Sequence, residues 1–180
     1  SMGQGLSSGG VEIYCVSHTG LRNADVLAGE LNERYDVIVL ADMNARTILE
    51  GFETGSVPPR YAGGLGAEGV RELDAFVRGG GTLVAINGST GFAVQQLHLP
   101  VKDVTQGLKR EQFSASGAIV ELLVDPSHPV MSGMAPRSKV MVGRSPVWVT
   151  EEGFEGRILA AYPKEGTPLL SGYFLGEEHV

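Results

Sequence analysis

Residues 36–42 read Asp36-Val37-Ile38-Val39-Leu40-Ala41-Asp42, and this stretch decides the fold class. Its apolar residues are continuous rather than alternating, which is typical of a strand in a parallel sheet that is covered on both faces. A second strand of this kind is expected at 82–86, after three glycines at 79–81 that are expected to end the preceding helix. A further strand is predicted at Val11–Val16, where β-branched residues alternate with others.

Helical patterns occupy the segments between these strands. Asn23 is expected to cap a helix over 24–33, and further helices are predicted at 45–50, 67–78 and 91–97. An order of strand, helix, strand, helix indicates right-handed crossovers between parallel strands. The sequence therefore predicts an α/β fold with a parallel central sheet and helices on both faces.

The pattern changes after Pro100. Short strands separated by turn residues are predicted at 118–124, 139–142, 147–150, 157–162 and 169–175. These are expected to be antiparallel β additions to the sheet edge, or a small β-subdomain. Residues 1–10 are rich in Gly and Ser and are expected to form a tag-like or disordered leader, and residues 11–180 a single domain.

Composition excludes several classes of partner. The 180-residue chain has a net charge of −7, so a basic surface for nucleic acid is not expected. No apolar run approaches the roughly 20 residues that span a bilayer, and no membrane partner is expected. No signal peptide is recognised, which leaves the compartment open; a longer parent protein could be exported.

Metal and cofactor sites are not expected in this chain. Its single cysteine, Cys15, excludes an internal disulfide and a Cys-rich zinc site. The four histidines have no ligand-like spacing, and His128 lies in a Pro-rich turn where a turn role is predicted; the set is His18, His98, His128 and His179. A zinc site assembled from distant residues is the alternative to this expectation.

Polar residues follow both of the buried strands. Asp42 and Arg46 come after the first strand, and Asn87, Ser89 and Thr90 come after the second. In open α/β sheets, ligands bind outside the carboxyl ends of the strands. These five residues are therefore the candidate ligand-binding crevice, for a small molecule or a peptide. The alternative is that Asp42 and Asn87 only form turns and cap helices.

No catalytic residue is expected at these turns. A nucleophile there would be an exposed Cys or Ser with a His base. Ser89 lies in Gly88-Ser89-Thr90-Gly91, which does not have the spacing of the Gly-x-Ser-x-Gly elbow, and Cys15 lies within a predicted strand. A Gly-x-Gly-x-x-Gly match at 64–69 does not follow a strand, so a loop entering a helix is predicted. A hydrolase using Ser89 or Cys15 is kept as the alternative.

Residues 80–89 resemble the nucleophile-elbow region of class I glutamine amidotransferase-like domains. In that family a strand after a Gly-rich turn ends in a cysteine, and Asn87 falls at about the position of this cysteine. The departure removes the chemistry that the family performs, because an amide cannot form a glutamyl thioester.

A closer resemblance is to the C-terminal amidotransferase-like domain of some bacterial zinc carboxypeptidases of the carboxypeptidase A type. It is carried by five stretches, at 35–43, 45–51, 58–66, 125–130 and 170–178. The resemblance implies a flavodoxin-like fold and a non-catalytic accessory role. It also implies a parent peptidase whose zinc ligands lie in a preceding domain, and no zinc-binding or catalytic residue carries over to this chain.

The resemblance also sets the expected partners. The peptidase domain of the parent protein is the first, and the chain is expected to be a piece of that longer protein, cut short at its C-terminus. The isolated chain is then expected to have no activity. The remaining alternative is an interaction or dimerisation module, in which an open sheet edge pairs two copies into a homodimer.

Overall fold

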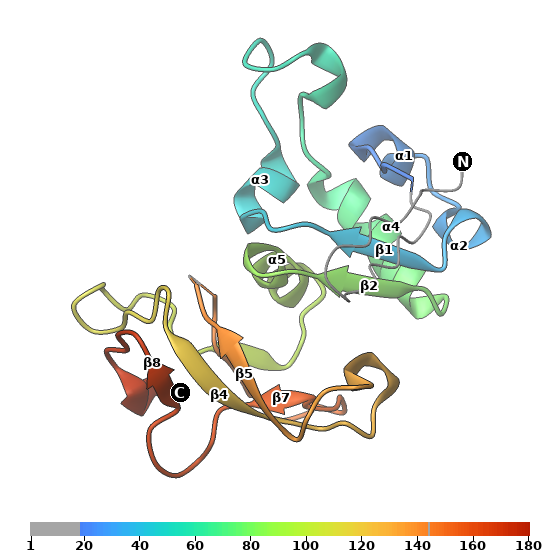
Figure 1. Ribbon diagram of the computed structural model, residues 1–180. Helices are drawn as coiled ribbons and strands as arrows, with labels where there is room; N and C mark the ends of the chain where they lie inside the picture. Colours follow the sequence, from blue (N-terminus) through green and yellow to red (C-terminus); the bar gives the residue numbers. More distant parts are fainter. Residues whose placement is uncertain (1–18, 144) are drawn as a thin grey trace, which may run out of the picture.

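The computed structural model describes residues 19–143 and 145–180. The predicted strand Val11–Val16 lies outside the described residues, and so do Cys15 and His18. Figure 1 shows helices and parallel strands in the N-terminal half of the chain and antiparallel strands in the C-terminal half, with α5 (Gly88–Gln96) between them. Among the helices described, none has the length and apolar character that a membrane span requires.

The fold is mixed α/β and contains a parallel sheet of two strands, β1 (Val37–Leu40) and β2 (Thr82–Ala85). The strands pair in register, with Val37 opposite Thr82 and Leu40 opposite Ala85. Both strands were predicted from their apolar runs, and each is shorter than the run. The carboxyl ends of β1 and β2 therefore lie side by side, as the candidate crevice requires.

Within the described part of the chain, one face of this parallel sheet is open. Ile38 is buried, whereas Val37, Val39 and Val84 keep 51%, 56% and 39% of their surface exposed. The prediction of cover on both faces is therefore wrong for the residues that the structure describes. An apolar pattern records that a surface favours burial, but it does not specify which segment covers it.

The helix predicted over 24–33 is two short helices, α1 (Asn23–Leu27) and α2 (Leu31–Arg34). The break follows from Gly29 and Glu30, which both have positive φ, 74° and 54°. Left-handed backbone ends an α-helix, and glycine adopts it without a Cβ penalty. The apolar periodicity continues across the break, which is why the sequence indicated one helix.

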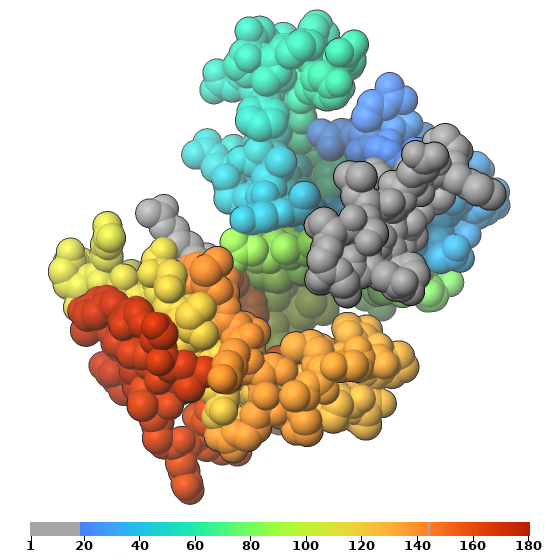
Figure 2. All heavy atoms as spheres, viewed as in Figure 1, coloured from blue at the N-terminus to red at the C-terminus, as the bar shows by residue number. Residues whose placement is uncertain are grey.

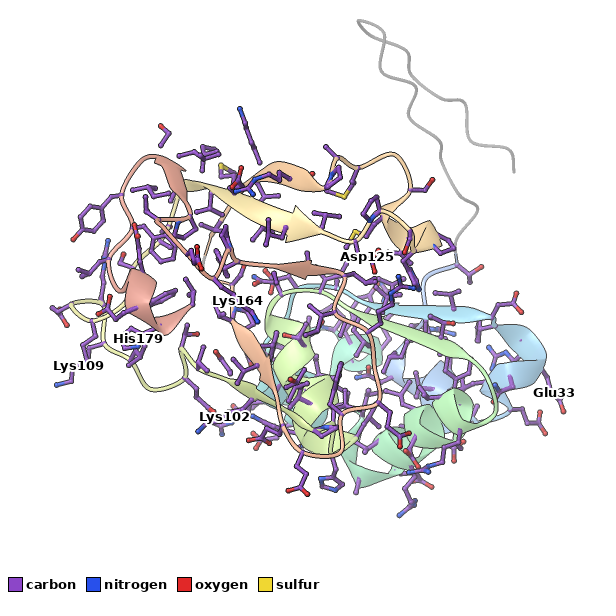
Figure 3. All side chains as sticks on the ribbon, turned by 90° about the horizontal axis from the view of Figure 1, so that it is seen from below. Glu33, Lys102, Lys109, Asp125, Lys164 and His179 are labelled. Carbon is purple, nitrogen blue, oxygen red and sulfur yellow. The ribbon has the colours of Figure 1, made fainter. Side chains whose placement is uncertain are left out.

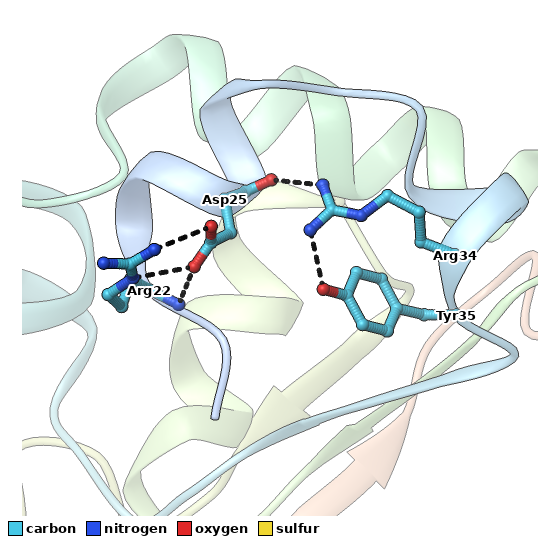
Figure 4. Close-up of polar contacts among 4 residues, drawn as sticks. All are labelled: Arg22, Asp25, Arg34 and Tyr35. Carbon is cyan, nitrogen blue, oxygen red and sulfur yellow. Dashed lines mark hydrogen bonds and ion pairs between the residues drawn. The ribbon is translucent and has the colours of Figure 1, made fainter. Parts of the chain in front are cut away.

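Arg22, not the predicted Asn23, caps α1. Its backbone N–H donates to the Asp25 carboxylate at 3.0 Å, and its guanidinium pairs with the same carboxylate (Figure 4). Asn23 instead donates to the carbonyl of Gly63 at 2.8 Å, which ties α1 to a distant loop. Figure 4 also shows Arg34 donating to the Tyr35 hydroxyl.

The next two helices are close to their predictions: α3 (Ala45–Glu50) and α4 (Gly66–Arg78). Between them a loop that includes a 3-10 turn, η1 (Pro59–Tyr61), projects as an arm, which Figure 2 shows standing above the rest of the surface. The base of the arm is closed by a hydrogen bond from the Gly63 N–H to the Phe52 carbonyl at 2.9 Å. A Cβ on Gly51 would overlap the backbone of Gly63, so this base requires glycine.

The C-terminal half forms sheets of its own. β3 (Val101–Asp103) pairs with β6 (Trp148–Thr150), and β4 (Ile119–Val124) pairs with β5 (Arg137–Met141), β7 (Ala160–Ala161) and β8 (Leu169–Ser171). All these pairs are antiparallel, as predicted, but none extends the parallel sheet. Two 3-10 turns complete this half, η2 (Pro129–Met131) and η3 (Glu177–His179).

Each half has its own hydrophobic core. The N-terminal core is centred on Leu73, Phe76 and Phe92, each 1% exposed. The C-terminal core is centred on Ala118 and Val120, both fully buried, with Phe174 packed in a T-shape against Phe113 at 5.7 Å between ring centres. The region where the halves meet, at the first turns of α5, is therefore bordered by two separately packed units.

Candidate functional site

The turn between β2 and α5 has a strained residue at its centre. Asn87 has φ 50° and ψ −114°, which lies outside the regions that L residues ordinarily occupy. A conformation of this kind costs about 1–3 kcal/mol and persists only where the surrounding structure holds it. A sharp, strained turn from strand to helix is also the geometry that exposes the nucleophile in an elbow.

Asp42, at the end of β1, holds this turn. Its carboxylate accepts hydrogen bonds from Asn87 Nδ2 and from the backbone N–H of Gly88, each at 2.9 Å. The Asn87 hydrogen bond, with that of Gly88, lowers the pKa of Asp42 below its ordinary value, so Asp42 is an anion at neutral pH. The contribution of the Asp42 carboxylate to folding stability is therefore complete at pH values above its pKa in the unfolded chain. It is lost as the pH falls through its lower pKa in the folded chain.

The hydroxyl groups that follow Asn87 are both engaged. Ser89 is fully buried; its Oγ accepts from the Ile86 N–H at 2.7 Å and lies 2.9 Å from the carbonyls of Leu40 and Ile86, to which it can donate. Thr90 donates to the carbonyl of Asn87 at 2.5 Å. Ser89 is not presented to solvent as a nucleophile, and both hydroxyls join the first turn of α5 to the strands and turn before it.

Arg46 makes no hydrogen bond or ion pair with Asp42, Asn87, Ser89 or Thr90 among the described residues. Its side chain is 82% exposed and pairs with Glu50 one turn along α3, at 2.6 Å. The Glu50 carboxylate raises the pKa of the guanidinium and occupies its Nε donor. The helical spacing of four residues gives Arg46 a partner on its own helix, so the sequence position close to Asp42 is no guide to where the guanidinium lies.

A cavity of about 690 Å³ lies beside the first turns of α5. It touches the strained turn at Gly88, and none of the five predicted crevice residues lines it. Its walls come from α5, β3, β6 and two long loops; the apolar part includes Val94, Val101, Leu108, Phe113 and Trp148. This size is within the range of roughly 300–1,000 Å³ that is usual for small-molecule sites.

The polar lining of the cavity includes acidic and basic groups. Asp103 is used internally, because its Oδ1 accepts from the Thr105 N–H and hydroxyl, at 2.8 and 2.6 Å. Lys102 and Arg110 make no ion pair with any residue that the structure describes. In Figure 3, Lys102 and Lys109 are on one side of the view, and Glu33 is on the other side. The cavity therefore has two cationic groups, Lys102 and Arg110, available for an anionic ligand, and one further carboxylate, Glu151, in its lining.

The described residues contain no group of three or more His, Cys, Asp or Glu side chains close enough to hold a metal ion. His128 caps η2 by accepting from the Val130 N–H at 3.3 Å, which confirms the turn role predicted for it.

No pattern in the sequence indicated the cavity. Its lining residues come from α5 and from positions between 101 and 151, and no local spacing connects them. The single tryptophan of the chain, Trp148, was the only unusual residue among them and could have drawn attention to this region.

Comparisons with protein-family models, with curated proteins and with solved structures find no match to this chain. The resemblance to amidotransferase-like domains of zinc carboxypeptidases therefore stays a prediction.

Proposed function

We propose that this chain is a non-catalytic accessory domain of the class I glutamine amidotransferase-like, flavodoxin-like type, which binds a small molecule or peptide bearing a carboxylate in the cavity beside α5. The observation that carries the proposal is the state of Asn87. It has the strained backbone of a nucleophile elbow, yet its side chain is an amide hydrogen-bonded to Asp42.

The absence of chemistry is supported by the groups around this turn. An amide is no nucleophile, and Ser89, the neighbouring hydroxyl, is buried and hydrogen-bonded on all sides by backbone groups. A serine nucleophile needs an exposed Oγ within reach of a base. The hydroxyl therefore supports the position of α5 rather than a reaction.

Ligand binding is supported by the cavity. It opens where the strand-to-helix turn ends, which is the place where α/β sheets bind ligands. The rings of Trp148 and Phe113 offer apolar walls, and Lys102 and Arg110 offer positive charge. A ligand with an apolar body and a carboxylate matches this lining, because Arg and Lys bind carboxylates through charge-assisted hydrogen bonds.

In this proposal the macromolecular partner is the peptidase domain of a longer zinc carboxypeptidase. Its support is the resemblance of the five sequence stretches and the open apolar face of the parallel sheet, where Val37 and Val39 are about half exposed. Apolar side chains on a parallel sheet are ordinarily covered.

The binding proposal is tested by the fluorescence of Trp148, the only tryptophan of the chain. Titration with a panel of short peptides bearing free C-terminal carboxylates is expected to give a saturable change with at least one member. The Gly91→Leu variant is expected to abolish it, because a Cβ at Gly91 meets open space in the cavity wall. Gly20→Leu is the matched control, since Gly20 is also unhindered and does not line the cavity.

Two further variants test the role of charge. Lys102→Ala and Arg110→Ala are each expected to weaken binding about tenfold, the effect of losing one hydrogen bond to a charged group. Binding that survives Gly91→Leu would place the ligand elsewhere. Turnover of glutamine, ester or peptide substrates by the isolated chain would contradict the non-catalytic part of the proposal.

A further inference from the structure

Asn87-Gly88 is the only Asn-Gly pair in the chain, and it lies at the strained turn. We propose that Asn87 is a site of spontaneous covalent modification. Its side chain closes onto the backbone nitrogen of Gly88 to give a succinimide, which opens to aspartate or isoaspartate. This inference does not depend on the proposed binding function.

The backbone of Asn87 is already arranged for ring closure. About the Cα–C bond of an L residue, Cβ is offset by about −120° from the backbone nitrogen. A ψ of −114° therefore places the nitrogen of Gly88 almost in line with Cβ of Asn87. The succinimide ring contains this N–C–Cα–Cβ arc and is nearly planar, so it requires this eclipsed arrangement. In ordinary helix or strand conformations the same nitrogen is turned away from the side chain.

Asp42 brings the two reacting groups together. One of its carboxylate oxygens accepts from Asn87 Nδ2 and the other from the Gly88 N–H, both at 2.9 Å. Two nitrogens bound to one carboxylate are neighbours, so the side-chain amide lies beside the backbone nitrogen that attacks it. Gly88 has no side chain to hinder this approach, and a Cβ there would lie 2.9 Å from the Asp42 oxygen.

The same contacts provide a route for the proton. As the Gly88 nitrogen bonds to Cγ of Asn87, its proton passes to the Asp42 carboxylate. The Cγ–Nδ2 bond then breaks, and Nδ2 leaves as ammonia with the proton that Asp42 returns. Water adds to either carbonyl carbon of the ring. Attack at Cγ gives aspartate, and attack at the main-chain carbon gives isoaspartate, in which the chain continues through the side chain.

The product changes the turn. A carboxylate at position 87 faces the Asp42 carboxylate where an amide donor stood before, and two like charges at hydrogen-bonding distance repel. The isoaspartate form also adds an atom to the backbone between β2 and α5. Either product loosens the contact at Gly88, which forms part of the cavity wall.

The experiment compares the folded chain with the same chain unfolded in guanidinium chloride, at one neutral pH and one temperature. Peptide mass mapping follows the gain of about one dalton at position 87, as an amide NH2 is replaced by OH, and isoaspartate methyltransferase labels the isoaspartate. We expect faster modification in the folded chain, by about tenfold, because the reacting groups are held in position. Asn23, Asn32 and Asn44, none followed by Gly, are internal controls and are expected to stay unmodified.

The role of Asp42 is tested with Asp42→Asn in the folded state. We expect the modification rate to fall by about a hundredfold, the lower end of the contribution of a positioned acid or base. The matched control is Asp74→Asn, which removes an exposed carboxylate paired with Arg78 on α4 and is expected to leave the rate unchanged. Modification that is equal or slower in the folded wild-type chain than in the unfolded chain would overturn the proposal, whatever the variants do.

Discussion

The Ser89 hydroxyl lies where the ends of β1 and β2 meet the first turn of α5. It contacts the N–H and carbonyl of Ile86 and the carbonyl of Leu40, within 2.9 Å of each, and it is fully buried. The Ile86 N–H also donates to the Leu40 carbonyl at 3.1 Å, at the end of the pairing between the two strands. A single side chain thus bridges backbone groups at the ends of both strands.

Replacing Ser89 with alanine is expected to destabilise the fold by about 1–3 kcal/mol, because it removes two hydrogen bonds of a buried hydroxyl, each of which contributes about 0.5–1.5 kcal/mol. Chemical denaturation measures the free energy of unfolding directly. Ser56→Ala is the control, because the Ser56 hydroxyl bonds within an exposed loop, and its change is expected to stay within about 0.5 kcal/mol. Equal effects of the two substitutions would contradict the structural role of Ser89.

Helix α5 both packs into the N-terminal core and borders the cavity. Phe92 and Ala93 of this helix are buried, while Gly88 and Gly91 border the cavity. Glycine within a helix is less favourable than alanine by roughly 0.5–1 kcal/mol. At Gly91 a Cβ would meet no atom within 4 Å, so the glycine keeps space open rather than avoiding a clash.

Gly91→Ala is therefore expected to stabilise the chain by about 0.5–1 kcal/mol, measured as a rise in the denaturant midpoint. The contrasting variant is Gly69→Ala in α4, where the new Cβ would lie 2.7 Å from Cβ of Leu65 and something must shift. That variant is expected to lower the midpoint. A gain in stability at both positions would show that helix propensity alone decides the effect.

At the scale of the whole molecule, the two cores are separate. Phe76 belongs to the N-terminal core, and Phe174 packs with Phe113 and Tyr162 in the C-terminal core. The sheets of the two halves share no strand pairing. Because stability is distributed in locally cooperative units, we expect each half to open without the other.

Phe76→Ala and Phe174→Ala are each expected to cost about 3–5 kcal/mol in the half that contains the phenylalanine. Amide hydrogen exchange is expected to show lost protection in β1, β2 and α4 for the first variant, and in β4 and β5 for the second. Loss of protection in both halves by either variant would show instead that the chain unfolds as one unit.

Sequence periodicity alone was sufficient for β1, β2, α3 and α4, because the signal for each lies within its own residues. It also placed Asp42 and Asn87 together, since the carboxyl ends of paired parallel strands meet at one edge. The split between α1 and α2 was missed because the apolar spacing of Val26 and Leu31 continues through the left-handed residues that end the helix.

Tertiary structure alone decided the remaining features. It buried Ser89 beneath the strand ends and, among the described residues, left one face of the parallel sheet uncovered. The cavity, too, exists only because β3, β6 and the loops of the C-terminal half fold back toward α5. Local sequence determines which backbone conformation a segment favours; contacts between residues far apart in the chain depend on how the segments pack, which no local pattern records.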